Sequence, residues 1–275
     1  MKNCWLQNKT VLITGGASGI GAGIARLLIT KYACKVIAVI IDDTGLEQTV
    51  RELGENSGNF TCLYYDVSQY ENWIKIKKYL EDNSVQVDIL INNAGIFPAF
   101  GRFENVAKDE LENCLNIDFY SVVYSIQVMY PHISKSDTPA FVTISSSAAL
   151  APIAGTAPYT AAKSASKALT ECFAFEHPEI YVGCVCPGFT KTNLFSRQKE
   201  DISKNKLISA FMSKRDRMVK KIVHGIKRKK YRMVYGADAK LMEFLFKFFP
   251  KSFPRFFRWI MKISKQQMFE DIFIK

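Results

Sequence analysis

The stretch Thr14-Gly15-Gly16-Ala17-Ser18-Gly19-Ile20-Gly21 decides the expected fold of this 275-residue chain. An apolar, β-branched stretch precedes it at residues 10–13, and a helical pattern follows it at residues 20–31. Glycines between a strand and a helix permit a tight turn and let a pyrophosphate approach the backbone, while the helix N-terminus supplies free N–H groups. The glycines are spaced differently from G-x-G-x-x-G. The strand–turn–helix context nevertheless predicts dinucleotide binding.

The rest of the first 190 residues alternates short apolar stretches with helical patterns. Most of the predicted strands are continuously apolar, which is typical of parallel strands buried on both faces. This alternation predicts an α/β fold with a Rossmann-like doubly wound parallel sheet of about seven strands. Such sheets bind ligands beyond the carboxyl ends of their strands. The predicted strands are residues 10–13, 35–41, 60–64, 87–91, 140–145, 181–186 and 231–235, and the predicted helices are residues 20–31, 71–83, 108–130, 160–176 and 206–230.

Charge divides the chain into two parts. The whole chain has 37 basic and 26 acidic side chains, a formal net charge of +11. Residues 1–192 hold 15 and 19, a net of −4, whereas residues 193–275 hold 22 and 7, a net of +15. The acidic body argues against a nucleic-acid-binding protein. We expect a dinucleotide-binding and catalytic core over residues 1–192, and a substrate lid (residues 193–205) with a basic, aromatic helical C-terminal extension of the same domain over residues 193–275.

The cysteines indicate a reducing compartment. There are seven, scattered along the chain, and the N-terminus shows no apolar signal segment, so we expect reduced thiols in a cytoplasmic protein. Cys184 and Cys186 form the one close pair, and on a strand both would face the same side. We interpret them as small buried hydrophobic residues, and no metal site is expected.

Three further strand ends carry residues suited to a dinucleotide. Asp66 and Val67 follow the third predicted strand, where a carboxylate could accept the adenine amino group. Asn92-Asn93-Ala94-Gly95 follows the fourth, with small residues that would admit a flat ring and a ribose. Pro187-Gly188 follows the sixth, and Thr190 and Thr192 offer hydroxyl and backbone groups. Four coincident strand ends make ordinary loop chemistry an insufficient explanation.

The end of the second predicted strand bears on the choice between NAD and NADP. An acidic residue there would bind the ribose hydroxyls, whereas a basic residue would accommodate a 2′-phosphate. The strand ends in Ile40-Ile41-Asp42-Asp43, without Lys or Arg. Asp42 therefore favours NAD.

Tyr159-x-x-x-Lys163 places a phenol and an ammonium group one helical turn apart on one face. A free tyrosine has a pKa near 10, but a neighbouring ammonium and an oxidised nicotinamide would both favour the phenolate. Ser146 follows the fifth predicted strand and could polarise a substrate carbonyl or hydroxyl. Asn116 is a poor helix former inside a long helical stretch, where it could bend the helix and hold a water that relays protons to Lys163.

Together these segments resemble the short-chain dehydrogenase/reductase family over about residues 8–192, in the family's order and spacing. The resemblance implies hydride transfer between C4 of the nicotinamide of NAD(P) and a secondary alcohol or ketone. It implies Tyr159 as general acid/base, Ser146 as substrate stabiliser and Lys163 as the residue that tunes Tyr159 and binds ribose. Asn116 would complete the relay. Ile40 and Ile41 depart from the family, because its acidic residue would fall there. The expected cofactor contacts are Gly15, Ser18, Gly19, Ile20, Gly21, Asp42, Asp66, Val67, Asn93, Tyr159, Lys163, Pro187, Gly188, Thr190 and Thr192.

Two alternative functions are weaker. A Ser-His-Asp hydrolase would need a G-x-S-x-G elbow, which no serine has. A catalytically inactive dinucleotide-binding relative, associated with a membrane surface and acting as a binding or regulatory protein, is the second alternative. All four catalytic positions are filled, which favours the enzyme. The family resemblance also implies a homodimer or homotetramer formed through the helices around residues 111–130 and 160–176.

The last forty residues interleave aromatic and basic side chains, as in Phe244, Lys247, Phe256, Arg258 and Trp259. Three interpretations remain open for this segment: packing on the body, peripheral association with an anionic membrane, and an oligomer contact. An apolar entrance to the site would suit a steroid-, retinoid- or lipid-like alcohol or ketone.

Overall fold

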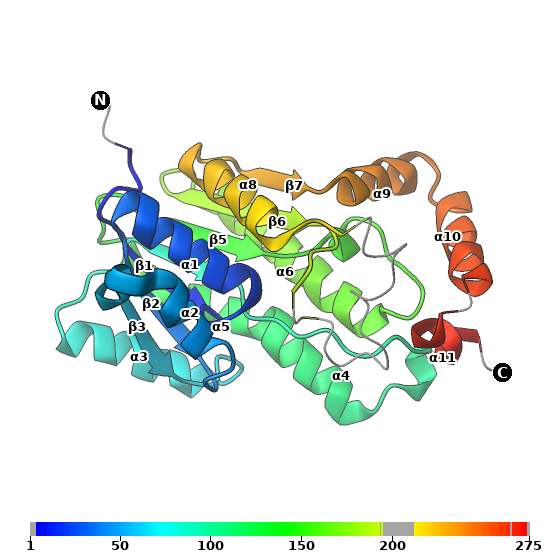
Figure 1. The fold of residues 1–275 in the computed structure, drawn as a ribbon, viewed down its shortest axis with the longest axis horizontal. Coiled ribbons are helices and arrows are strands. Elements are labelled where there is room, and N and C mark those ends of the chain that lie inside the picture. The colour runs from blue at the N-terminus through cyan, green and yellow to red at the C-terminus, as the bar shows by residue number, and fades with distance from the viewer. Residues whose placement is uncertain (1–3, 193, 195–211, 265, 274–275) are drawn as a thin grey trace.

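A seven-stranded parallel sheet forms the centre of the molecule (Figure 1). The computed structural model describes residues 4–192, 194, 212–264 and 266–273. The strands lie in the order β3-β2-β1-β4-β5-β6-β7, so the direction of winding reverses between β1 and β4. Strand ends on either side of such a reversal leave a crevice for a ligand. The strands are β1 (Thr10–Thr14), β2 (Lys35–Ile40), β3 (Phe60–Tyr64), β4 (Ile89–Asn92), β5 (Ala140–Ile144), β6 (Tyr181–Pro187) and β7 (Arg232–Tyr235).

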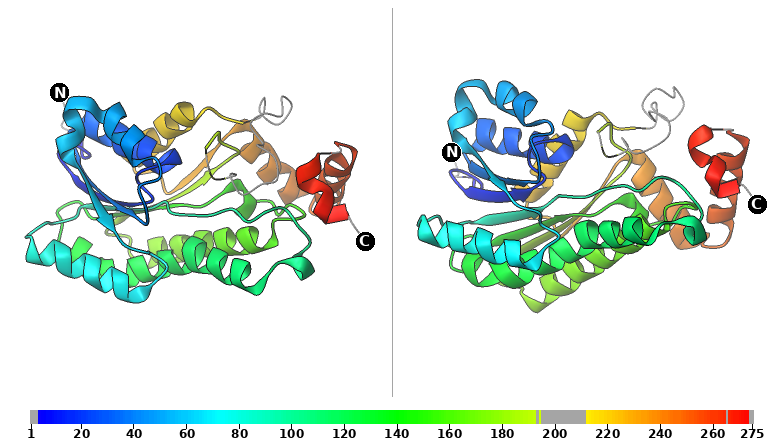
Figure 2. Two further views of the ribbon diagram at one scale, coloured as in Figure 1. Left: turned by 60° about the horizontal axis from the view of Figure 1, so that its bottom comes forward. Right: turned by 90° about the horizontal axis from the view of Figure 1, so that it is seen from below.

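Helices cover both faces of the sheet (Figure 2). On one face, apolar side chains of α1 and α8 pack on β1, β2, β4, β5 and β6, and on the other face α3, α5 and α6 do so. The central strands are buried along nearly their whole length, which explains their uninterrupted apolar sequences. The helices are α1 (Gly19–Tyr32), α2 (Leu46–Leu53), α3 (Tyr70–Asp82), α4 (Lys108–Leu115), α5 (Ser121–Ile133), α6 (Ala157–Glu176), α8 (Arg215–Lys227), α9 (Ala237–Phe248), α10 (Ser252–Ile263) and α11 (Glu270–Phe273).

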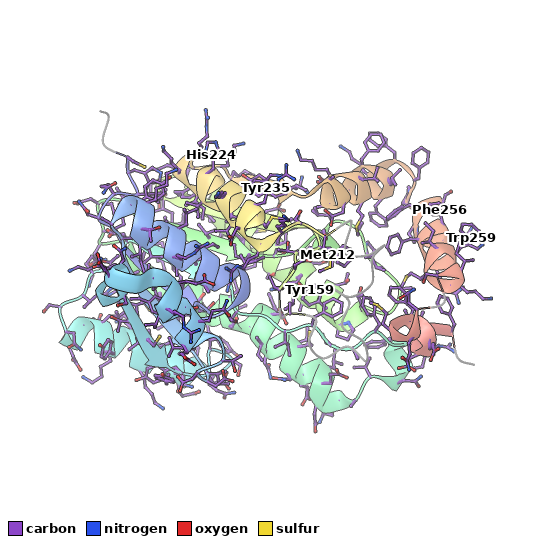
Figure 3. All side chains as sticks on the ribbon, viewed as in Figure 1. Tyr159, Met212, His224, Tyr235, Phe256 and Trp259 are labelled. Carbon is purple, nitrogen blue, oxygen red and sulfur yellow. The ribbon has the colours of Figure 1, made fainter. Side chains whose placement is uncertain are left out.

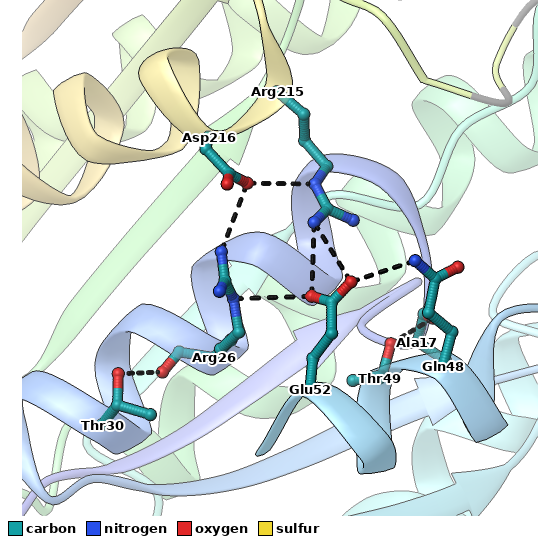
Figure 4. A network of polar contacts seen from close by, with 8 residues as sticks. All are labelled: Ala17, Arg26, Thr30, Gln48, Thr49, Glu52, Arg215 and Asp216. Carbon is teal, nitrogen blue, oxygen red and sulfur yellow. Dashed lines mark hydrogen bonds and ion pairs between the residues drawn. The ribbon is translucent and has the colours of Figure 1, made fainter. Parts of the chain in front are cut away.

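A network of polar contacts joins α1, α2 and α8 behind the glycine-rich turn (Figure 4). Glu52 of α2 contacts both Arg26 of α1 and Arg215 of α8, and Asp216 contacts the same two arginines. The hydroxyl of Thr49 donates to the carbonyl of Ala17 inside the turn, at 2.8 Å. Single exposed ion pairs contribute little to stability, but this network connects three helices around one loop. It thereby supports the turn that borders the site.

The C-terminal helices α9, α10 and α11 form one end of the molecule (Figures 1 and 2). The carboxylate of Asp238, in the first turn of α9, accepts the N–H of Phe189 at 2.6 Å. Met261 of α10 belongs to the same buried cluster as Tyr159. The extension therefore contacts the core directly beside the carboxyl ends of the strands.

The observed fold confirms the predicted doubly wound parallel sheet, with most strand ends within one or two residues. The predicted helix over residues 108–130 proved to be interrupted, because α4 and α5 flank a π-helical turn, Asn116–Tyr120. Of the helix predicted over residues 206–230, α8 covers Arg215–Lys227, and residues 206–211 lie outside the described residues. Helix α2 was not in the prediction. Apart from Leu194, the predicted lid over residues 193–205 lies outside the described residues.

Candidate active site

A cavity of about 450 Å³ opens at the carboxyl ends of β1, β2, β4, β5 and β6. Its walls come from the loops that follow these strands and from the first turns of α1 and α6. This volume is within the range of sites that hold small molecules and cofactors. The cavity therefore lies where the reversal of strand order predicts a ligand site.

The glycine-rich turn borders one side of the cavity and is tightly packed against the loop after β4. Gly15 has a φ of +63°, a region that favours glycine, and a Cβ at Gly21 would lie 2.2 Å from the carbonyl oxygen of Gly15. The Asn93 side-chain amide donates to the Gly15 carbonyl at 3.1 Å. The hydroxyl of Thr14 accepts the N–H groups of Asn93 and Ala94, each at 2.9 Å. These bonds tie the ends of β1 and β4 together.

The residues around this turn fit a nicotinamide dinucleotide. Ser18 and Gly19, at the start of α1, line the cavity. The Ser18 side chain makes no capping hydrogen bond, and the first turn of α1 contains no acidic residue, so its N–H groups and its positive dipole end suit phosphate oxygens. At the end of β2, Ile41 is 69% exposed and Asp42 lines the cavity. Hydroxyl and backbone hydrogen bonds from Thr44 lower the pKa of Asp42.

The structure brings most of the predicted cofactor residues to the cavity and leaves three outside its walls. Gly21 is buried under the turn, where its missing side chain makes room for the Gly15 carbonyl. The Asp66 carboxylate accepts the N–H of Ser68 at 2.9 Å, and Val67 is buried in the core beside Trp73. Those that line the cavity are Gly15, Ser18, Gly19, Ile20, Asp42, Asn93, Tyr159, Lys163, Pro187, Gly188, Thr190 and Thr192.

Tyr159 and Lys163 project from the first turns of α6 into the cavity wall. Both are buried, and the Lys163 ammonium lies 5.8 Å from the centroid of the Tyr159 ring. Ser146 follows β5 and lines the same wall, and its hydroxyl accepts the N–H of Ala148 at 3.2 Å. The three side chains that the sequence placed in one constellation therefore do meet.

The surroundings of Tyr159 act on its proton in opposite directions. Burial is the largest effect and raises the pKa of Tyr159 above its ordinary value, because a phenolate is poorly solvated there. The Lys163 ammonium and a hydrogen bond with Ser146 lower the pKa, whereas the Asp118 carboxylate raises it. Burial is the largest effect and would lower the pKa of Lys163, but Asp118, Tyr159 and Cys114 together outweigh it, and the pKa of Lys163 is raised. Lys163 is therefore an ammonium group at neutral pH.

The water-mediated relay predicted for Asn116 stays a prediction, and the side chain that contacts Lys163 directly is a different one. Asp118 makes that contact: its Oδ1 lies 2.9 Å from Lys163 Nζ, whereas Asn116 is half-buried and does not line the cavity. Side chains two positions apart on a helix point in directions that differ by about 200°, so they cannot both face one ammonium. The π-helical turn sets which residue does so, and π turns are frequent at functional sites.

Two further groups of site residues escaped the sequence analysis. Asp238 supports the loop after β6 by accepting the Phe189 N–H, and it lies 49 positions away along the chain. Apolar side chains line the cavity beside Tyr159, and the rings of Phe97 and Tyr159 are 4.7 Å apart. Aromatic and aliphatic residues in loops carry no pattern that separates cavity walls from core. These lining residues are Phe97, Phe100, Ile153, Phe189 and Leu194.

Comparison with known proteins agrees with this geometry. The short chain dehydrogenase family model matches residues 9–203. The putative oxidoreductase SadH of Mycobacterium tuberculosis is 29% identical over 262 residues, covering 90% of this chain and 94% of that protein. Human dehydrogenase/reductase SDR family member 4 is 30% identical over 194 residues, covering 70% of this chain and 69% of that protein.

Solved structures share the fold. A short-chain dehydrogenase from Streptomyces avermitilis superposes with a TM-score of 0.76 at 22% identity, covering 94% of this chain and 98% of that one. The 3-ketoacyl-(acyl-carrier-protein) reductase from Brucella melitensis, complexed with NADH, gives 0.73 at 22% identity, covering 85% and 99%. The match to the family model spans well over half of the sequence. This chain therefore belongs to the short-chain dehydrogenase/reductase family of NAD(P)-dependent oxidoreductases.

Proposed function

We propose that this protein transfers a hydride between a nicotinamide cofactor and a hydrophobic secondary alcohol or ketone, with Tyr159 as general acid/base. One observation carries the proposal: Tyr159, Lys163 and Ser146 meet in the wall of a cavity at the switch in strand order. NADH in the Brucella melitensis reductase and 5-hydroxy-NADP in an archaeal alcohol dehydrogenase of similar fold support a nicotinamide cofactor.

Each residue has a defined task in this mechanism. The nicotinamide, when bound, supplies or accepts the hydride. Tyr159 gives a proton to the carbonyl oxygen during reduction and takes one from the hydroxyl during oxidation. Ser146 donates a hydrogen bond to the same oxygen and orients it toward Tyr159. The Lys163 ammonium favours the phenolate, an effect that the Asp118 carboxylate opposes, and Lys163 would also hold the nicotinamide ribose.

The cavity walls beside Tyr159 favour a hydrophobic substrate. Phe97, Phe100 and Tyr159 lie in one buried cluster that also includes Met212 and Met261. Asp42 and Lys163 are the only charged side chains among the described residues that line the cavity. A steroid-, retinoid- or lipid-like alcohol or ketone would suit such walls, because apolar surface is best matched by apolar ligand surface.

NAD is the proposed cofactor in preference to NADP. Asp42 lines the cavity at the end of β2, and its carboxylate would accept hydrogen bonds from ribose hydroxyls but repel a 2′-phosphate. Ile41 beside it offers no charge to a phosphate. Fluorescence titration with NADH and NADPH tests this preference, and tighter binding of NADPH would overturn it.

A substrate panel tests the proposed activity. The purified full chain is incubated with NAD or NADH and hydrophobic secondary alcohols or ketones, and nicotinamide absorbance is followed. We expect turnover that is lost in Tyr159→Phe. Binding of NADH without turnover of any panel member would instead favour the catalytically inactive relative.

We further propose that α9 and α10 associate peripherally with an anionic membrane. Phe256 and Trp259 are 54% and 55% exposed, and their rings stack at the outer end of the molecule, whereas Tyr159 lies in its interior (Figure 3). Six Lys and Arg against two acidic residues lie within residues 237–263. Exposed aromatics among cations suit the interface of an anionic bilayer. No helix in the described ranges is long and apolar enough to cross a membrane.

Flotation with liposomes of phosphatidylserine and phosphatidylcholine tests this surface. We expect the wild-type chain to float, and Phe256→Glu/Trp259→Glu to remain at the bottom of the gradient. Ile74→Glu on α3 is the matched control, because Ile74 is 50% exposed but lies on another helix. Equal flotation of wild type and double variant would contradict the proposal.

The oligomeric state and the division of the chain are proposals as well. We propose a homodimer or homotetramer through α4, α5 and α6, where Phe175 of α6 is exposed. Light scattering on the purified chain tests it. We also propose that residues 193–275 belong to the same domain as residues 1–192, which the hydrogen bond between Asp238 and Phe189 supports.

A further inference from the structure

A fully buried carboxylate contacts the site lysine. Asp118 is 0% exposed, and its Oδ1 lies 2.9 Å from Lys163 Nζ. Its Oδ2 accepts the N–H of Ile96 at 3.1 Å. A Cβ at Gly95 would lie 2.5 Å from Asp118 Oδ1 and 3.0 Å from Lys163 Nζ, so glycine at this position makes room for the pair. The packing around it therefore accommodates this ion pair.

The pair changes the charge that Tyr159 experiences. A buried ammonium without a counter-charge is costly. Burial raises the pKa of Asp118, but Lys163 and the hydrogen bonds from Ile96 and Cys114 favour its charged form. We take Asp118 as the carboxylate that supplies the counter-charge because its Oδ1 lies 2.9 Å from Lys163 Nζ. An ammonium alone would favour the Tyr159 phenolate, but an ammonium paired with a carboxylate has no net charge. Ionisation of Tyr159 would then leave a net negative charge in a buried site. The proton on Tyr159 is held more tightly as a result.

We propose that Asp118 is a positioning residue that holds and neutralises the Lys163 ammonium, so that Tyr159 remains a phenol and the enzyme favours carbonyl reduction. This inference rests on the proposed function. In that direction the carbonyl carbon receives a hydride from the reduced nicotinamide, which becomes oxidised, and the carbonyl oxygen receives the Tyr159 proton. Solvent then returns a proton to the phenolate.

The other groups around Tyr159 do not replace this effect. Cys114 of α4 faces the pair, but burial raises the pKa of its thiol well above neutrality, so it carries no charge there. Ser146 contributes a hydrogen bond without charge. The remaining described members of the cluster around Tyr159 are apolar, including Phe97, Met212 and Met261. Among the residues that the structure describes, Lys163 and Asp118 are thus the charged groups that act on the pKa of Tyr159.

Titration of the phenolate tests the inference without turnover. Near-ultraviolet absorbance is recorded against pH for wild type and Asp118→Asn, and each curve is corrected with the same protein carrying Tyr159→Phe. The difference isolates Tyr159 among the tyrosines. We expect its midpoint to fall by about one pH unit in Asp118→Asn, because the Lys163 ammonium, whose charge the nearby Tyr159 also favours, is no longer neutralised. An unchanged or higher midpoint would overturn the inference.

Turnover separates this inference from the proposed function. With a ketone and an alcohol from the substrate panel, the alkaline limit of reduction and the acidic limit of oxidation should both move to lower pH by about one unit in Asp118→Asn. Asp88→Asn is the matched control, because the Asp88 carboxylate accepts a hydrogen bond from the Thr10 N–H at the amino end of β1, away from the cavity. A shifted Tyr159 midpoint without turnover in any protein would reject the proposed activity alone. Equal shifts in both variants would reject the role of Asp118.

Discussion

The carboxyl edge of the sheet and the helices α9 and α10 place similar side chains in opposite environments. At the sheet edge the charged pair Asp118 and Lys163 is buried, and Lys163 also lines the cavity. On α9 and α10 the cations and large apolar residues such as Phe256 and Trp259 are both exposed. Buried charges need partners within the chain, whereas an exposed apolar surface marks a site of interaction with a membrane or another molecule. The sheet edge thus pairs its buried charges within the chain, whereas α9 and α10 leave large apolar side chains exposed.

The largest expected effect comes from removing the phenol of the sheet edge. Tyr159→Phe should lower kcat by about 10³-fold, because a general acid/base is lost, and leave NADH affinity nearly unchanged. Steady-state kinetics and NADH fluorescence measure the two quantities. Tyr181→Phe is the control, since this buried tyrosine lies at the amino end of β6 and its hydroxyl donates a hydrogen bond to the Lys230 carbonyl. Near-normal turnover of Tyr159→Phe would refute the mechanism.

The loss of an apolar side chain should affect the free energy of unfolding differently in the two regions. Ile91→Ala in β4 should lower the free energy of unfolding by about 3 kcal/mol, because Ile91 is fully buried between β1 and β5. Phe256→Ala on α10 should change it by less than about 0.5 kcal/mol. Urea denaturation measures both. Equal losses would mean that the exposed face of α10 is a structural part of the fold.

The cations of the extension should matter for lipid and not for the fold. Lys251→Gln/Arg255→Gln removes two exposed charges and should weaken binding to anionic liposomes by about 30-fold, since each cation near such a surface contributes about 1 kcal/mol. Lys220→Gln/Lys221→Gln on α8 removes the same charge from another helix and serves as control. Similar weakening by both variants would indicate a general effect of net charge.

The smallest expected effect concerns the adenosine end of the cavity. Asp42→Ala should weaken NADH binding by about tenfold through the loss of a charged hydrogen-bond acceptor, and should affect NADPH less. Parallel fluorescence titrations measure the ratio of the two affinities. An unchanged ratio would show that Asp42 does not determine the preference for NADH over NADPH.

Much of the fold could be predicted because its signals are local. Short apolar stretches marked the strands to within a few residues, and the glycine-rich segment marked the turn after β1. The Tyr159-x-x-x-Lys163 spacing placed both side chains on one face of α6. Asp66 and Val67 follow a strand as predicted, yet the local Asx bond to Ser68 and the packing of Val67 keep them out of the cavity walls.

The sequence by itself determined the sheet, the glycine-rich turn and the constellation of Ser146, Tyr159 and Lys163, because periodicity and short spacings specify local geometry. Only the tertiary structure decided that Asp118 contacts Lys163, since this ion pair joins the π-helical turn to α6, a distant segment of the chain. It also decided which aromatic residues of α9 and α10 are exposed. Contacts between distant segments depend on how helices are rotated and packed, and no local pattern records that rotation.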